Sequence, residues 1–119
     1  MLYILNSKRK DKLRLIRARA WDQRLQKQGL TEALTEKQLK SLKKIDQLIA
    51  WNTVISERIA GQSELARELV RSNRQGLRFL AVEYGKKQAM ERAYFAYVIS
   101  SLGVPSEQSH DTLSEILLQ

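Results

Sequence analysis

The fold is decided by residues 34–61, which read LTEKQLKSLKKIDQLIAWNTVISERIAG. Thr35 stands three residues before Gln38, and this spacing is that of a capping box, in which each side chain bonds the backbone N–H of the other residue at a helix start. Gly61 follows the last apolar residue and is typical of a helix end, because glycine adopts the left-handed conformation without steric cost. The stretch therefore predicts a helix over about residues 36–60.

The apolar residues of this predicted helix cover a wide arc of its surface. An arc wider than one stripe indicates contact with more than one neighbour. Because a small bundle offers few neighbours, we expect the remaining apolar surface to pair with a second copy of the chain in a homodimer. The apolar positions are Leu42, Ile45, Leu48, Ile49, Trp51, Ile55 and Ile59.

A basic helix is predicted before this stretch, over about residues 7–28. Asn6 or Ser7 can cap its first turn, and Gly29 marks its end. Its apolar residues recur at three- and four-residue steps, which places them on one face. These residues are Leu15, Ala18, Trp21 and Leu25. The opposite face carries Lys12, Ile16, Arg19, Gln23 and Lys27.

The apolar residues of the region 63–102 keep nearly one helical phase, so this region forms either one long bent helix or two shorter helices. The helix can bend or break at two places, residues 72–76 and Gly85, because glycine lowers helix propensity by about 1 kcal/mol relative to alanine. Gly103 followed by Pro105 marks a helix end.

Together these elements predict an all-α protein, a small bundle of three to four helices with one long helix, straight or bent, in its C-terminal half. Its 119 residues suit a single domain, which we place at residues 1–104. Residues 105–119 are expected to form an acidic tail with a short amphipathic helix. Asn52 and Asn73 interrupt apolar or helical stretches, and we expect them at exposed positions.

Positive charge is concentrated at the start of the chain. Residues 1–44 hold 13 Lys+Arg and 4 Asp+Glu, a net charge of +9, whereas residues 45–104 add +2 and residues 105–119 contribute −3. Lys and Arg neutralise phosphates and release condensed counterions, so the asymmetry indicates a helix that contacts nucleic acid or another polyanion. The predicted polyanion-binding residues are Lys8, Arg9, Lys10, Lys12, Arg19, Lys27, Lys40, Lys43 and Lys44.

Other interpretations of this charge stay open. The cations can serve solubility alone, bind an anionic membrane surface, or be covered by the acidic residues 105–119 folding back on the basic helix. A major-groove reader of the helix-turn-helix type is disfavoured, because the positions four residues before Gly29 and Gly61 hold Leu25 and Glu57 rather than small residues.

The sequence predicts a protein without catalytic residues, metal or cofactor. It contains no Cys, which excludes a cysteine nucleophile and a thiolate zinc site, and which suits the cytoplasm. His110 is its single imidazole, and the Glu107–His110 spacing occurs once, whereas a di-iron bundle needs two such pairs and two further Glu. No Gly-rich phosphate loop is present, and no stretch approaches the roughly 18 apolar residues of a membrane span.

A second function class fits the same architecture: a helical adaptor, export chaperone or anti-activator-type protein that binds a partner's amphipathic helix in a groove. The position of the free apolar surface discriminates between this class and a polyanion-binding protein. The predicted partner-binding residues are Trp21, Trp51, Tyr94, Phe95 and Leu117.

Overall fold

The computed structural model describes residues 2–103, with side chains from Arg9 onward. Within this range the chain is all-α, as predicted, and none of its helices is long and apolar enough to cross a bilayer. The predicted tail helix in residues 105–119 lies outside the described residues. The helices are α1 (Leu2–Gln28), α2 (Glu36–Ser41), α3 (Ile45–Arg58), α4 (Ser63–Ser72), α5 (Arg74–Gly85) and α6 (Ala89–Ser101).

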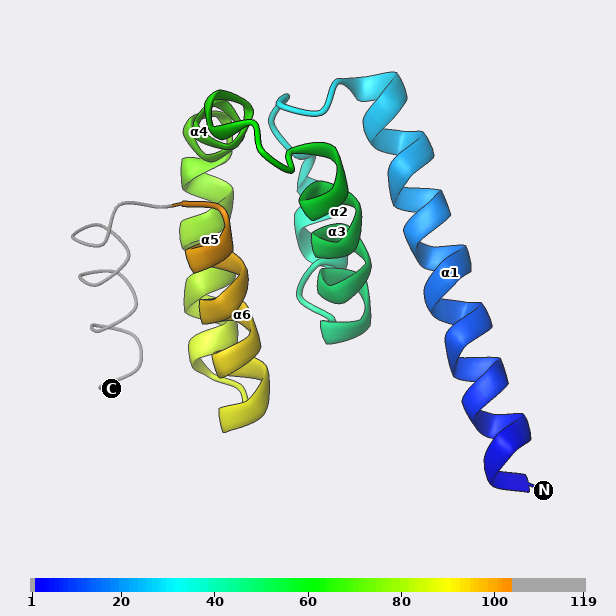
Figure 1. The fold of residues 1–119 in the computed structure, drawn as a ribbon. Coiled ribbons are helices and arrows are strands. Elements are labelled where there is room, and N and C mark those ends of the chain that lie inside the picture. Colours follow the sequence, from blue (N-terminus) through cyan, green and yellow to red (C-terminus); the bar gives the residue numbers. More distant parts are fainter. Residues whose placement is uncertain (1, 104–119) are drawn as a thin grey trace.

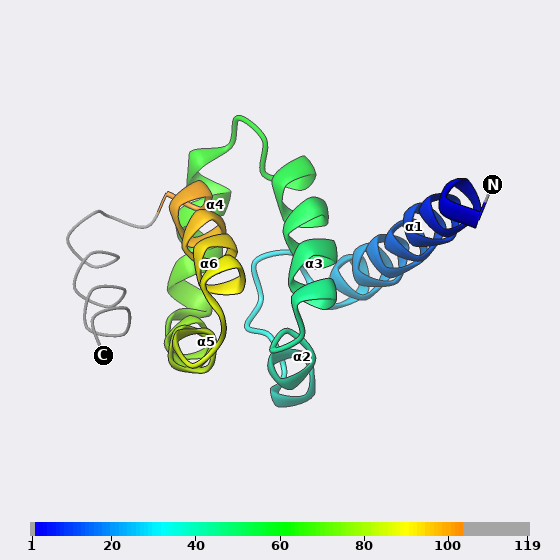
Figure 2. The same cartoon turned by 90° about the horizontal axis from the view of Figure 1, so that it is seen from below.

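Helix α3 lies at the centre of the molecule (Figure 1). α1 packs along one side of α3, and α6 packs on the other side with α5 running antiparallel beside it (Figures 1 and 2). The short α2 precedes α3, and α4 crosses one end of the α5–α6 hairpin. This order places α1 and the hairpin on opposite sides of α3.

The helix ends that depend on local chemistry agree with the prediction. Gln38 N donates to Thr35 Oγ1 at 3.1 Å, and Thr35 N donates to Gln38 Oε1 at 2.9 Å, so the capping box forms. Gly29, Gly61 and Gly103 each follow a helix with a positive φ, of 105°, 72° and 73°. The predicted start of the first helix near residue 7 is wrong: α1 begins at Leu2, and no glycine or proline interrupts the chain there.

The predicted helix over residues 36–60 is two helices, because the chain leaves the helical path after Ser41. Leu42 is completely buried, and its carbonyl accepts a hydrogen bond from Tyr84 Oη at 2.6 Å. Lys44 is then extended, with φ −89° and ψ 129°, before α3 begins. Burial of Leu42 and its bond to α5 therefore outweigh the helix propensity of the sequence.

The prediction of one long helix or two for residues 63–102 is also wrong, since the structure breaks at both weak points and forms α4, α5 and α6. Asn73 separates α4 from α5, and the residues after Gly85 separate α5 from α6. The described part of the chain consequently holds six helices rather than three to four.

Asn73 is buried, contrary to the expectation of an exposed position, and its side chain joins two segments of the chain. Its Oδ1 accepts from Leu34 N at 2.8 Å, while its Nδ2 donates to Leu69 O at 3.0 Å and to Glu32 O at 3.4 Å. The side chain thus ties the loop after α1 to the end of α4. Asn52 is buried as well, and its Nδ2 donates to Tyr94 Oη at 3.3 Å.

The core contains four large aromatic side chains. Trp21 of α1 and Trp51 of α3 are each 1% exposed. Tyr84 of α5 stacks on Phe95 of α6, with ring centroids 5.0 Å apart and planes 7° from parallel. Each of the four comes from a different helix, so aromatic packing joins α1, α3 and the α5–α6 hairpin.

Replacing Asn73 with Ala should lower the free energy of unfolding by about 1–3 kcal/mol, because the buried Leu34 N–H loses its acceptor. Urea denaturation followed by circular dichroism measures the change. Ser72→Ala is the matched control at an exposed neighbour and should change stability by less than about 0.5 kcal/mol. Equal effects of the two substitutions would refute the bonding role of Asn73.

Tyr84→Phe should destabilise the protein by about 1–3 kcal/mol, since the buried Leu42 carbonyl loses its donor. Burial raises the pKa of the Tyr84 hydroxyl above its ordinary value, with a smaller contribution from the Glu91 carboxylate. The folded chain therefore keeps a proton that the unfolded chain releases above about pH 10.

It follows that this tyrosine makes stability fall as the pH rises above about 10, by up to about 1.4 kcal/mol per pH unit. Denaturation curves of the two proteins between about pH 9 and 12 isolate the contribution, because Tyr84→Phe leaves every lysine in place. Identical alkaline slopes in wild type and variant would contradict the assignment.

Candidate functional site

The first half of α1 extends away from the other helices (Figures 1 and 2). Every residue from Arg9 to Ile16 is exposed. The cause is a difference in length: α1 has 27 residues and α3 has 14, which correspond to about 40 Å and about 21 Å of helix. α3 therefore covers only the second half of α1.

That second half is attached to α3 by burial and by polar bonds. Trp21 and Leu25 are buried, and Trp21 Nε1 donates to Gln47 Oε1 at 2.8 Å. Asp22 receives two hydrogen bonds from the Arg58 guanidinium, at 2.9 and 2.8 Å. These contacts fix the direction in which the first half of α1 leaves the bundle.

Four of the exposed cations of α1 form a row on its outer side. Arg9, Lys12, Arg19 and Lys27, here called the basic row, lie opposite Trp21 and Leu25 and are all exposed. Among the described side chains, no carboxylate oxygen lies within 4.0 Å of a basic-row nitrogen.

Lys10 and Arg14 are two further exposed cations, in the first half of α1. Arg14 is not among the residues predicted from the sequence to bind a polyanion. The side chain of Lys8 lies outside the described residues.

The three other predicted cations lie on α2 and the turn after it. Lys40 Nζ is 3.5 Å from Glu36 Oε1, and Lys43 Nζ is 4.0 Å from Glu83 Oε2 of α5. Lys44 is exposed at the start of α3. Since Lys43 faces α5, these residues do not continue the basic row.

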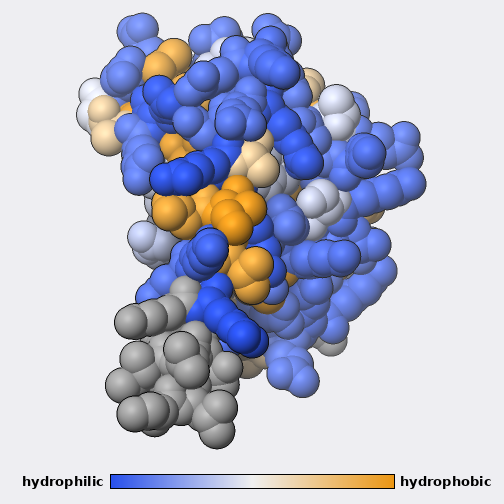
Figure 3. Space-filling view, turned by 90° about the vertical axis from the view of Figure 1, so that its right-hand side faces the viewer, coloured by the Kyte–Doolittle hydropathy of each residue, from blue (hydrophilic) through white to orange (hydrophobic). Residues whose placement is uncertain are grey.

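Apolar side chains are exposed between the cations of α1. Leu13 is 47%, Leu15 51% and Ile16 52% exposed. Figure 3 views the molecule from the α1 side and shows apolar surface within a largely hydrophilic face. Leu15 had been predicted on the buried stripe, and it is exposed because α1 has already diverged from α3 at that point.

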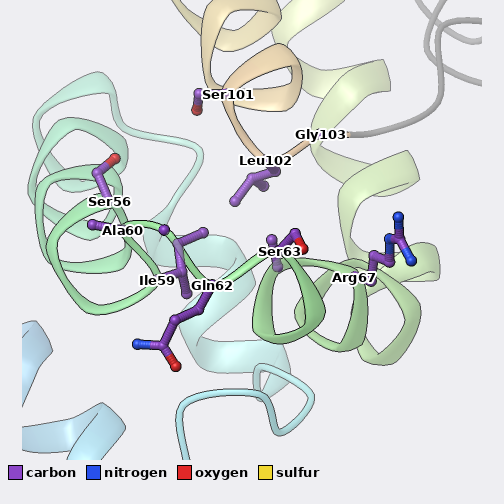
Figure 4. A pocket seen from close by; sticks show the side chains of 11 residues that line it. Ser56, Ile59, Ala60, Gln62, Ser63, Arg67, Ser101, Leu102 and Gly103 are labelled. Carbon is purple, nitrogen blue, oxygen red and sulfur yellow. The ribbon is translucent and has the colours of Figure 1, made fainter.

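The hollows in the described part of the chain include two that lie between helices. One, of about 330 Å³, lies between α1 and α3 and is lined by Asp11, Arg14, Leu15, Ala18, Asp46, Ile49, Ala50 and Thr53. The other, of about 690 Å³, lies between α3, α4 and α6 (Figure 4). Its described lining consists of small, hydroxyl and aliphatic residues with Gln62 and Arg67, and includes no carboxylate or imidazole to act as a general base.

Most of the predicted partner-binding residues belong to the core. Trp21, Trp51 and Phe95 are each 1% exposed, so a partner cannot reach them on the folded chain. Tyr94 is partly buried and packs against the core, and Leu117 lies outside the described residues. The free apolar surface is instead on α1, with further exposed residues on α5 and α6.

No protein-family model, curated protein or solved structure significantly matches this chain.

Proposed function

We propose that this chain is a non-catalytic cytoplasmic binding protein that contacts nucleic acid, or a polyanion of similar charge density, through α1. The observation that carries the proposal is the basic row, four exposed cations with no carboxylate within 4.0 Å among the described side chains. Cations already paired within the protein would have little charge left to offer a ligand.

The arrangement suits contact with a phosphate backbone rather than with individual bases. A duplex presents one negative charge per about 1.7 Å of its axis, and each phosphate neutralised by Lys or Arg releases condensed counterions. Arg9 and Arg19 can also donate two parallel hydrogen bonds to one phosphate. Such binding is independent of base sequence and weakens as salt is added.

An adaptor that binds a partner's amphipathic helix is the second candidate, and one observation favours it. Leu13, Leu15 and Ile16 expose apolar surface beside the cations, and phosphate groups gain nothing from that surface. A protein partner with both apolar and acidic residues would use the two kinds of side chain together.

Reversing Lys12, Arg19 and Lys27 together to Glu should abolish binding to fluorescein-labelled duplex DNA, measured by fluorescence anisotropy at about 50 mM salt. Wild-type affinity should fall steeply between about 50 and 200 mM salt, with a logarithmic slope of about −0.9 for each phosphate that the protein neutralises. The melting temperature should hardly change, because the three side chains are exposed and unpaired among the described residues.

The matched control reverses Arg67, Arg74 and Arg78, exposed residues of α4 and α5. Each variant removes six units of charge from the chain's net +8, so both have a net charge of +2 and differ only in where the charge is removed. Equal reductions of affinity in the two variants, or no binding by wild type at low salt, would refute the proposed role of α1.

A further inference from the structure

The outer side of α1 exposes apolar and basic side chains next to one another. Leu13 and Ile16 are about half exposed, at 47% and 52%, and they lie one helical turn apart. Lys12 and Arg19 neighbour Ile16 on the helix, four residues before it and three after it, and are exposed too. A ligand that uses both kinds of side chain would be apolar as well as acidic.

The chain itself contains a segment with that chemistry. Residues 105–119 hold three acidic residues and no Lys or Arg, a net charge of −3. Leu113, Ile116 and Leu117 have the i, i+3, i+4 spacing that gathers apolar side chains on one face of a helix. The segment therefore offers one apolar face and a net charge opposite to that of α1.

We propose that residues 105–119 of one chain dock on the outer face of α1 in a second chain, so that two chains exchange their C-terminal segments. Leu113, Ile116 and Leu117 would cover Leu13 and Ile16. Two packed helices are about 8–10 Å apart, which is close to the screening length at 0.1 M salt, so their opposite net charges attract each other across the contact.

The position of Gly103, the last described residue, favours a second chain as the source of the segment. Gly103 follows α6, and α3 lies between α6 and α1 in both views (Figures 1 and 2). The face that carries Leu13 and Ile16 points away from Trp21 and Leu25, hence away from the bundle. To reach it, a chain's own segment would have to pass around both α3 and α1.

A segment that comes from a second chain can approach the outer face of α1 directly and need not pass around α3 and α1. A two-fold axis relates the two chains so that each gives one segment and receives one, and the assembly closes as a dimer. This inference goes beyond the proposed function and does not depend on it, because it concerns contacts between copies of the chain in the absence of any polyanion.

The experiment uses three full-length variants and sedimentation velocity. The face variant carries Leu13→Asp and Ile16→Asp, and the tail variant carries Leu113→Asp and Leu117→Asp. The control, Val82→Asp, changes an apolar residue of α5 that is 49% exposed and so resembles Ile16 in exposure. Circular dichroism verifies that each variant is folded, and Ile16→Ser replaces the face variant if the double substitution unfolds the chain.

Wild type and the Val82→Asp control should sediment as dimers, at twice the 13.8 kDa of one chain. The face variant and the tail variant should each be monomeric, with the dimer dissociation constant raised at least tenfold. An equimolar mixture of these two variants should recover a dimer of one chain of each kind, because the mixture still contains one intact face and one intact tail.

Three results would overturn the proposal. A monomeric wild type would show that the segment does not link two chains. A mixture that stays monomeric would show that the face and the tail do not bind each other between chains. Dissociation by Val82→Asp to the same extent as by the face variant would assign the interface to another surface.

Discussion

α1 is about twice as long as the helix against which it packs, and this mismatch determines which part of the molecule is available to a ligand. Trp21, Leu25 and the Asp22–Arg58 pair hold the second half of α1 on α3. No described helix covers the first half of α1. α3 has only 14 residues and is too short to reach it, and α6 lies on the opposite side of α3. The exposure of Arg9 and Lys12 therefore follows from this mismatch in length, whereas Arg19 and Lys27 are exposed because they lie opposite Trp21 and Leu25.

Two buried polar side chains divide what the sequence pattern presents as longer helices. The Tyr84 hydroxyl bonds the Leu42 carbonyl where α2 ends, and the Asn73 amide bonds Leu34 and Leu69 where α4 ends. In each case a hydrogen bond between residues distant in sequence forms at the point where the helix ends. Periodicity along one segment contains no information about such a partner, which explains why the break after Ser41 was not predicted and why the weak point at residues 72–76 left one helix and two equally open.

Structural features that depend on residues close together in the sequence could be predicted from it. The Thr35–Gln38 capping box, the three left-handed glycines and the outward direction of Lys12, Arg19 and Lys27 all follow from spacing within a few turns. The exposure of Leu15 was not predictable, because it depends on where α3 stops. Equally, sequence pattern could not tell whether Trp51 and Phe95 meet the core or a partner, since both environments select large apolar side chains.

The two proposed occupants of α1 differ in how salt acts on them, because they use its residues differently. A polyanion would gain almost all its affinity from the cations, and added salt weakens that contribution steeply. An acidic amphipathic segment would also cover Leu13 and Ile16, and apolar contact does not depend on ionic strength in this way. A phosphate polymer has a far higher charge density than a segment of net charge −3. Low salt should consequently favour the polyanion on the basic row, whereas higher salt should shift occupancy toward the apolar contact.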